Sequence, residues 1–242
     1  MRLLVRSWNV YHGRTHPPSA GLHLEEMIRV VTADAPDAVA LQEVPLWAVR
    51  RLEAWSGMSA SWAMTMPALL GPLSRRATAT DPRRFRSSFT GQANALLVNP
   101  HLESGRHRRV VLNPGLSRSD WLLHGGQRRV CHALELETPA GRIVVANLHA
   151  SNSPDRRLVG TEIQRAAAFL ADAGRCVLCG DFNVLRHTVP GFTEPIGGVD
   201  QVLIRGLALA RGPEAWPEER RTVDGVVLSD HAPVEAVVEW TS

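Results

Sequence analysis

The sequence predicts one globular domain of the mixed α/β class, in which strands outnumber helices. The chain has 242 residues, and 44% of them are hydrophobic, which is enough for one large core. Short apolar runs bounded by turn residues recur along the whole chain, as in a strand-rich fold, and only three segments show helical signals. No linker or internal repeat divides residues 1–242, so we expect a single domain.

The predicted strands are the apolar runs that end at Gly, Pro, Asn, Asp or charged residues. They are 2–8, 38–43, 59–66, 92–98, 130–137, 142–149, 175–180, 199–204, 225–228 and 233–240. Polar positions alternate with apolar ones in some of these runs, whereas others are apolar almost throughout.

Helical spacing of apolar residues marks two segments. They are 21–34, with Leu24, Met27, Ile28 and Val31 on one stripe, and 156–173, with Ile163, Ala166, Ala167 and Leu170. Pro36 and Gly174 end them. A third helix is predicted near 45–56, with Pro45 in its first turn. Residues 68–91 are rich in Gly, Pro, Ser, Thr and Arg and predict a long surface loop.

Composition excludes several classes of protein. Charged residues make up 21% of the chain and the net charge is +3, which argues against disorder. No apolar run reaches the roughly 20 residues of a membrane-spanning helix, so we expect a cytoplasmic protein with no integral membrane association. Three cysteines do not suggest a disulfide framework, and we expect Cys176 and Cys179 to be core residues of a strand. Nothing in the sequence implies an oligomer.

All 27 basic residues are arginines. Coding bias explains this, but so does a need for planar, bidentate phosphate binding, and composition does not separate the two. The arginines cluster in the middle third of the chain, at 75–76, 83–86, 106–109 and 128–129.

Carboxylate, amide and imidazole groups follow the predicted strands. The clusters are Ser7-Trp8-Asn9, Leu41-Gln42-Glu43, Asn147-Leu148-His149, Cys179-Gly180-Asp181-Phe182-Asn183 and Leu228-Ser229-Asp230-His231, and Asp200 starts its own strand. Polar groups at strand ends can meet on one rim of a sheet while the apolar runs stay in the core. His12 follows Asn9 closely enough to reach the same rim, whereas the remaining histidines are expected in surface or loop positions.

The order and combination of these clusters resembles the endonuclease/exonuclease/phosphatase superfamily, which includes pancreatic deoxyribonuclease and the exonuclease III-type repair enzymes. Gly-Asp-Phe-Asn at 180–183 and Ser-Asp-His at 229–231 are the most specific pieces. Residues 148–151 are similar to the deoxyribonuclease version of the third motif, and 91–96 to the central strand of the family. The resemblance implies a four-layered α/β sandwich, two packed mixed β-sheets flanked by helices, and phosphoester hydrolysis that depends on Mg²⁺ or Mn²⁺.

The resemblance also implies a role for each site residue. Glu43 is the principal metal ligand with Asn9 and Asp230 close by, Asp181 orients or deprotonates water, Asn183 holds a phosphoryl oxygen, His231 is paired with Asp200, His149 protonates or stabilises the leaving oxygen, and Asn9, Asn94 and Arg129 contact substrate. A metal suits this chemistry, since carboxylates about 4 Å apart repel each other by about 4 kcal/mol at an intermediate dielectric. The number of ions, one or two, stays open.

A nucleic acid is the favoured substrate, because the arginine clusters could follow a phosphate backbone. An aromatic content of 5% argues against it. A small phosphoester or a phospholipid headgroup is the alternative, and the apolar segment 64–70 is the one candidate for a lipid-binding hairpin, although a strand end is favoured there. An inactive binding module is a remote third possibility, since no site residue is missing. Trp216 is expected to be a buried anchor rather than a base contact.

Overall fold

A computed structural model of the chain describes residues 1–242 except 20, 69–72, 74, 77–89, 115–126 and 242. Its larger sheet has six strands in the order β11-β14-β1-β3-β5-β4. They are β1 Arg2–Asn9, β3 Ala38–Pro45, β4 Ser59–Met66, β5 Gln92–Val98, β11 Ala208–Ala215 and β14 Val234–Glu239. β1 is parallel to β3 and the other neighbours are antiparallel, so the sheet is mixed.

A second sheet has five strands in the order β10-β9-β8-β7-β6. They are β6 Glu103–Val111, β7 Val130–Glu137, β8 Ile143–His149, β9 Cys176–Asp181 and β10 Asp200–Arg205. Only β8 and β9 are parallel. A small third sheet joins β2 Thr15–His16, β12 Thr222–Val223 and β13 Val226–Leu228.

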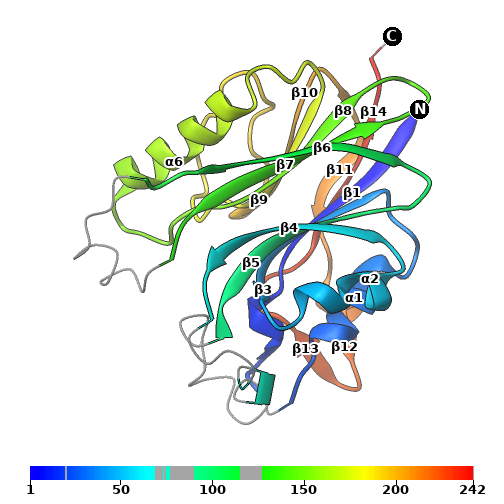
Figure 1. The fold of residues 1–242 in the computed structure, drawn as a ribbon, viewed down its shortest axis with the longest axis vertical. Coiled ribbons are helices and arrows are strands. Elements are labelled where there is room, and N and C mark those ends of the chain that lie inside the picture. Colours follow the sequence, from blue (N-terminus) through cyan, green and yellow to red (C-terminus); the bar gives the residue numbers. More distant parts are fainter. Residues whose placement is uncertain (20, 69–72, 74, 77–89, 115–126, 242) are drawn as a thin grey trace.

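The two large sheets pack face to face, with helices on their outer faces (Figure 1). One apolar cluster, including Leu3, Leu96 and Val145, fills the space between the sheets. Helices α1 Leu24–Thr32 and α2 Leu52–Ser56 cover the outer face of the larger sheet. Helix α6 Arg156–Phe169 covers the outer face of the other sheet. Short 3-10 turns lie at Tyr11–Gly13, Val49–Arg51 and Glu218–Arg221. This is the predicted four-layered α/β sandwich.

The predicted helix at 45–56 is wrong in its first half. Pro45 ends β3, where it pairs with Gln92, and helical residues begin only at Val49. A proline is tolerated there because β1 stops at Asn9, opposite Gln42. Pro45 therefore has no neighbouring strand on that side, and no inter-strand hydrogen bond needs the backbone N–H that proline lacks.

The sequence analysis missed one edge strand of each large sheet, β6 and β11, and the two-residue strands β2 and β12 of the small sheet. β6 carries Ser, Gly, His and three arginines and has no apolar alternation, since most of it is exposed. β11 contains Pro213 and two irregularities in its pairing with β14. Edge strands need only one neighbour, so their sequences are less constrained. Most of the predicted loop 68–91, including Arg83–Arg86, lies outside the described residues.

The parallel pairs decide where the polar strand ends meet. β1 and β3 end side by side, and so do β8 and β9, with His149 opposite Asp181. Asn147 then joins the two sheets, because its Nδ2 donates to the carbonyls of Leu41 (2.9 Å) and Ala95 (2.8 Å) while its Oδ1 accepts from Gln42 Nε2 (2.8 Å). Asn147 and its three partner residues are fully buried, so these hydrogen bonds hold the two sheets together directly beneath the rim.

The expectation of a surface or loop position is wrong for His132, which is fully buried within β7, but other expectations about the interior hold. Cys131, Cys176 and Cys179 are buried free thiols. Trp216 is buried, with Arg6 and Arg220 stacked on its ring and its Nε1 donating to Glu235. β4 ends at Met66, as favoured for segment 64–70. Within the described part of the chain, none of the helices combines the length and the apolar character that a membrane span requires.

Candidate active site

Glu43 points to the rim from an irregularity in β3. The pairing of β3 with β5 shifts register between Leu41 and Val44, and Glu43 has a φ of +59°. A bulge of this kind redirects a side chain, and a positive φ in a non-glycine residue stores strain. Asn183 (φ +51°) and Ser229 (φ +62°) show the same feature. Three residues at or just after the polar strand ends are therefore held in backbone conformations that are unfavourable for a non-glycine residue.

Asp181 lies at the centre of a hydrogen-bond cluster. Its Oδ2 accepts from Asn9 Nδ2 at 3.0 Å, and its Oδ1 accepts from the backbone N of Asn183 at 2.9 Å. The Asn183 side chain in turn donates to the carbonyl of Ala150 at 3.0 Å. Gly180 is required just before, because a Cβ there would lie 2.0 Å from the carbonyl oxygen of Leu148. The Gly-Asp-Phe-Asn motif thus joins β9 to the ends of β1 and β8.

His231 is paired with Asp200, as the resemblance implied. Its Nδ1 lies 2.7 Å from Asp200 Oδ2, and its Nε2 lies 4.0 Å from Asp181 Oδ2. The loop that carries His231 is tied to β1, since Ser229 Oγ donates to the carbonyl of Asn9 (2.7 Å) and Trp8 Nε1 donates to the carbonyl of His231 (2.9 Å). Residues more than 200 positions apart therefore share one fixed corner.

The two site histidines have opposite charge states. Burial lowers the pKa of His149 to about 3, and the charge of Arg129 adds to this effect. Burial also lowers the pKa of His231, but the hydrogen bond and charge of Asp200 outweigh it and raise that pKa to about 9. At neutral pH, His231 is an imidazolium and His149 a neutral imidazole.

The carboxylates are also differentiated. Burial and the carboxylate of Asp200, directly opposite on β10, together raise the pKa of Asp181 to about 7. Burial would raise the pKa of Glu43 too, but the neighbouring His12 holds it well below the usual value. His12 Nε2 lies 2.8 Å from Glu43 Oε2, so His12 does reach the rim. Glu43 is ionised, whereas Asp181 exchanges a proton near neutral pH.

Arg129 and Glu162 place two further charges beside the rim. Burial lowers the pKa of Arg129, while the carboxylates of Glu162, Glu43 and Asp181 oppose this shift. Glu162, on α6, is fully buried and accepts from both the backbone N and the Oγ of Ser151, each at 2.7 Å. Sequence reasoning missed Glu162, because its position in a helix with an apolar stripe predicts packing alone. No local signal in the sequence distinguishes it.

Two predicted residues are placed less centrally. Asn94 is fully buried, its Nδ2 donates to the carbonyl of Val130 at 3.0 Å, and its Oδ1 has no described partner. Asp230 is exposed, and its charge acts on His231 and Arg221. The roles of all these residues in substrate or metal binding stay predictions.

The donor set suits a hard divalent cation. Glu43 and Asp181 both face His149, whose Nε2 lies 3.9 Å from Glu43 Oε1 and 3.6 Å from Asp181 Oδ2. Asp181, Asp200 and His231 also offer ligand atoms within 4.8 Å of one another. Asp200 Oδ1 is buried without a described partner. Carboxylate and amide oxygens are the ligands that Mg²⁺ and Mn²⁺ prefer, so the residues present fit such an ion.

A two-sheet α/β sandwich with acidic and imidazole groups at one rim defines the class of this protein. The chain belongs to the endonuclease/exonuclease/phosphatase family, whose sequence profile matches residues 7–231. No curated protein sequence matches the chain significantly.

Solved structures share the fold at low sequence identity. An endonuclease/exonuclease/phosphatase from Beutenbergia cavernae is 17% identical with a TM-score of 0.70, and the match covers 100% of this chain and 72% of that one. The human Nocturnin catalytic domain with bound sulfate is 14% identical with a TM-score of 0.68, covering 99% and 95% of the two chains. ANGEL2, a 2',3'-cyclic phosphatase in complex with adenosine-2',3'-vanadate, is 14% identical with a TM-score of 0.66, covering 99% and 96%.

Proposed function

We propose that this protein is a phosphodiesterase that depends on Mg²⁺ or Mn²⁺ and hydrolyses nucleic acid. The observation that carries the proposal is the gathering of Glu43, Asp181 and His231 at one rim around His149, whose Nε2 lies 3.9 Å from Glu43 Oε1 and 3.6 Å from Asp181 Oδ2. Asp181 has a pKa of about 7, and His231, with Nε2 4.0 Å from Asp181 Oδ2, has a pKa of about 9. A base and an acid that are both in their active form between these values are what hydrolysis of a phosphodiester needs.

Each side chain has a task in this proposal. Asp181, oriented by Asn9 and by the backbone of Asn183, accepts a proton from the attacking water. His231 stays cationic through Asp200 and stabilises a phosphoryl oxygen or protonates the leaving oxygen. His149 is neutral, so it donates an N–H hydrogen bond rather than a proton.

Glu43, with Asn9 and Asp230, is the proposed holder of the divalent ion. The ion would act as a Lewis acid that draws charge from the phosphate and orients it. Arg129, whose Nη1 is buried without a described partner, would bind a phosphate oxygen beside it. Asn183 and Asn94 would contribute amide groups to the same substrate.

The direct test is hydrolysis of bis-p-nitrophenyl phosphate. We expect turnover with Mg²⁺ or Mn²⁺, loss of turnover in EDTA and recovery when the ion is restored. Asp181→Ala should lower the rate at least about 100-fold, as for a lost proton-transfer group. Metal-independent turnover, or a normal rate in the Asp181 variant, would contradict the proposal.

Substrate class needs a separate assay. Plasmid DNA, RNA, sphingomyelin, inositol phosphates and nucleotide diesters are incubated in parallel with Mg²⁺ or Mn²⁺. Cleavage of DNA or RNA supports a nuclease, whereas hydrolysis of only the small or lipid substrates supports the alternative phosphoesterase.

A further inference from the structure

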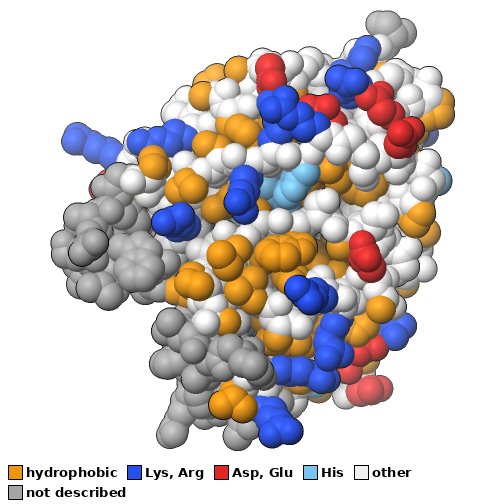
Figure 2. All heavy atoms as spheres, in the orientation of Figure 1, with side chains coloured by type: hydrophobic (Ala, Val, Ile, Leu, Met, Phe, Trp, Pro, Cys, Tyr) orange, Lys and Arg blue, Asp and Glu red, His pale blue; other side chains and the backbone are white. Residues whose placement is uncertain are grey.

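A surface groove of about 470 Å³ lies where the open edges of the two sheets approach each other. β4 is the edge strand of the larger sheet and β6 is the edge strand of the other. The groove is lined from β4 by Met64, Thr65 and Met66, and from β6 by Arg109 and its apolar neighbours. Figure 2 shows hydrophobic side chains gathered along this face, with basic side chains beside them.

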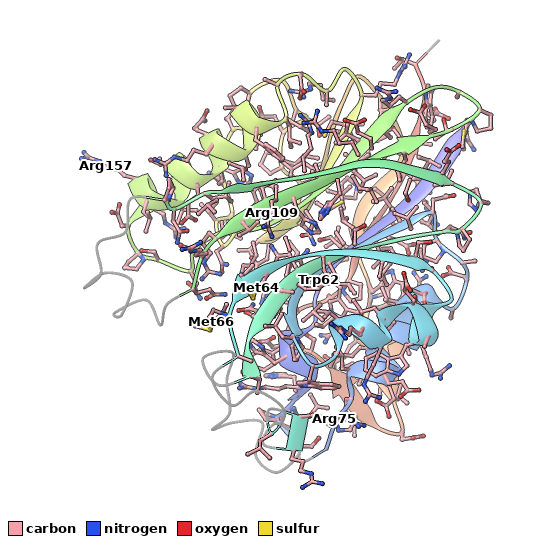
Figure 3. All side chains as sticks on the ribbon, in the orientation of Figure 1. Trp62, Met64, Met66, Arg75, Arg109 and Arg157 are labelled. Atoms are coloured by element: carbon pink, nitrogen blue, oxygen red, sulfur yellow. The ribbon has the colours of Figure 1, made fainter. Side chains whose placement is uncertain are left out.

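The apolar face of β4 continues beyond the groove lining to Trp62 and is unusually exposed. Trp62 is 40% exposed and Met64 is 46% exposed, while Ala63 between them is fully buried. Both therefore stand on one side of β4, followed by Met66, and Figure 3 shows the three in a row along the strand with Arg109 opposite. Side chains two apart on a strand repeat every 6–7 Å or so. Aromatic and thioether groups at such intervals form a surface on which flat rings can stack.

The charged side of the groove is purely basic. Arg109 and Arg128 line it, and none of the described lining residues is acidic. Among the described residues, no carboxylate lies within ion-pair distance of either guanidinium. Arg108, by contrast, points to the other face of β6 and is bound by Asp172. Within the described part of the chain, the groove therefore sets two positive charges without a carboxylate partner beside an apolar floor, which complements a chain that carries both phosphates and rings.

The groove begins next to the candidate active site. Arg128 and Arg129 are consecutive, so their Cα atoms are about 3.8 Å apart. Arg128 lines the groove, while Arg129 interacts with the charges of Glu43 and Asp181. The backbone N of Arg128 also donates to the carbonyl of Thr65 at 2.9 Å, which ties the start of β7 to the end of β4. A polymer with one phosphate at Arg129 would meet the groove with its next units.

We infer that this groove binds a single-stranded segment of a polynucleotide, with phosphates on Arg109 and Arg128 and bases on Trp62 and Met64. The inference rests on the proposed function, because it extends the substrate beyond the reacting phosphate. A single strand is favoured over a lipid surface, since Arg109 and Arg128 line the same groove as Met64 and Met66, which matches a chain that carries phosphates and rings side by side.

The test is fluorescence anisotropy with a labelled 12-nucleotide single strand, in EDTA so that no cleavage occurs. Trp62→Ala should weaken binding roughly 5- to 100-fold, the range for a lost stacking partner. Replacing Arg109 and Arg128 together by Gln should lower the slope of log affinity against log salt by about 0.7 for each arginine. Arg2→Gln is the control for the loss of one positive charge away from the groove, and it should lower neither affinity nor slope, because exposed Arg2 lies at the opposite end of β1 from Asn9.

Turnover of bis-p-nitrophenyl phosphate separates this inference from the proposed function. We expect the fall in oligonucleotide affinity to be at least five times larger than any change in turnover of the small diester. If Trp62→Ala and the double arginine variant both bind the oligonucleotide as tightly as the wild type does, the inference is overturned. Loss of binding to phosphatidylserine vesicles, with oligonucleotide binding intact, would overturn it in favour of a lipid surface. If the groove variants lose oligonucleotide binding but the wild type hydrolyses no diester, the proposed function fails and the inference about the groove remains supported.

Discussion

Asp200→Asn tests whether the charge of Asp200 keeps His231 cationic. Asn is nearly isosteric with Asp and retains an oxygen that can accept the hydrogen bond from His231 Nδ1, which lies 2.7 Å from the carboxylate. The substitution removes the negative charge, and burial then acts on the imidazole with less opposition. We expect the pKa of His231 to fall from about 9 to about its ordinary value of 6.5 or lower.

The size of the effect depends on pH. At pH 8 a group with a pKa of 9 is about nine-tenths protonated, whereas one with a pKa of 6.5 is about 3% protonated, which predicts roughly a 30-fold lower rate. At pH 5.5 both forms are largely protonated and this deficit nearly disappears. Because Asp200 also raises the pKa of Asp181, the variant should ionise Asp181 at lower pH. The optimum of the pH profile should therefore move toward acid.

The assay is hydrolysis of bis-p-nitrophenyl phosphate with Mn²⁺ between pH 5.5 and 9, together with NMR titration of the imidazole of His231. Asp224→Asn, in the exposed turn between β12 and β13, is the matched control and should leave both curves unchanged. A loss of rate that is equal at every pH, or a pKa of His231 that stays near 9 in the variant, would refute the reasoning.

Two further predictions concern stability. Burial, with a contribution from His107, lowers the pKa of His132 to about 3, so the unfolded chain binds more protons than the folded one below pH 6.5. The free energy of unfolding should therefore fall by about 2–3 kcal/mol from pH 6 to pH 4 because of His132. His132→Gln should abolish this part of the pH dependence, as measured by urea unfolding at the two pH values. An unchanged pH dependence in the variant would contradict the prediction. Glu162→Gln leaves one oxygen for two donors of Ser151 and should cost about 1–3 kcal/mol. Thermal unfolding measures it, and an unchanged Tm would show that Glu162 does not hold this loop.

Local pattern was sufficient for the elements that bury one face. Leu24, Met27, Ile28 and Val31 are at most 1% exposed, as the helical spacing predicts. Most strands also lie within one or two residues of their predicted ranges. In these segments, the hydrophobic effect acts on a periodicity that is readable over a few neighbouring residues.

Pairing partners could not be inferred in the same way. β6 is a strand because β7 binds one of its edges, and its own residues carry little apolar signal. Pro45 ended a strand rather than starting a helix because β1 stops before reaching it. Both outcomes depend on a distant segment, so no window of neighbouring residues contains them.

The sequence by itself determined the family motifs, and with them the strand ends that carry Asn9, Glu43, His149, Asp181 and His231. Only the tertiary structure decided that His149 is neutral and His231 charged, and that Glu162 of a helix supports the rim. The physical reason is that protonation depends on burial and on charges contributed by remote parts of the chain. The sequence alone does not distinguish His149 from His231, and their pKa values diverge only in the folded protein.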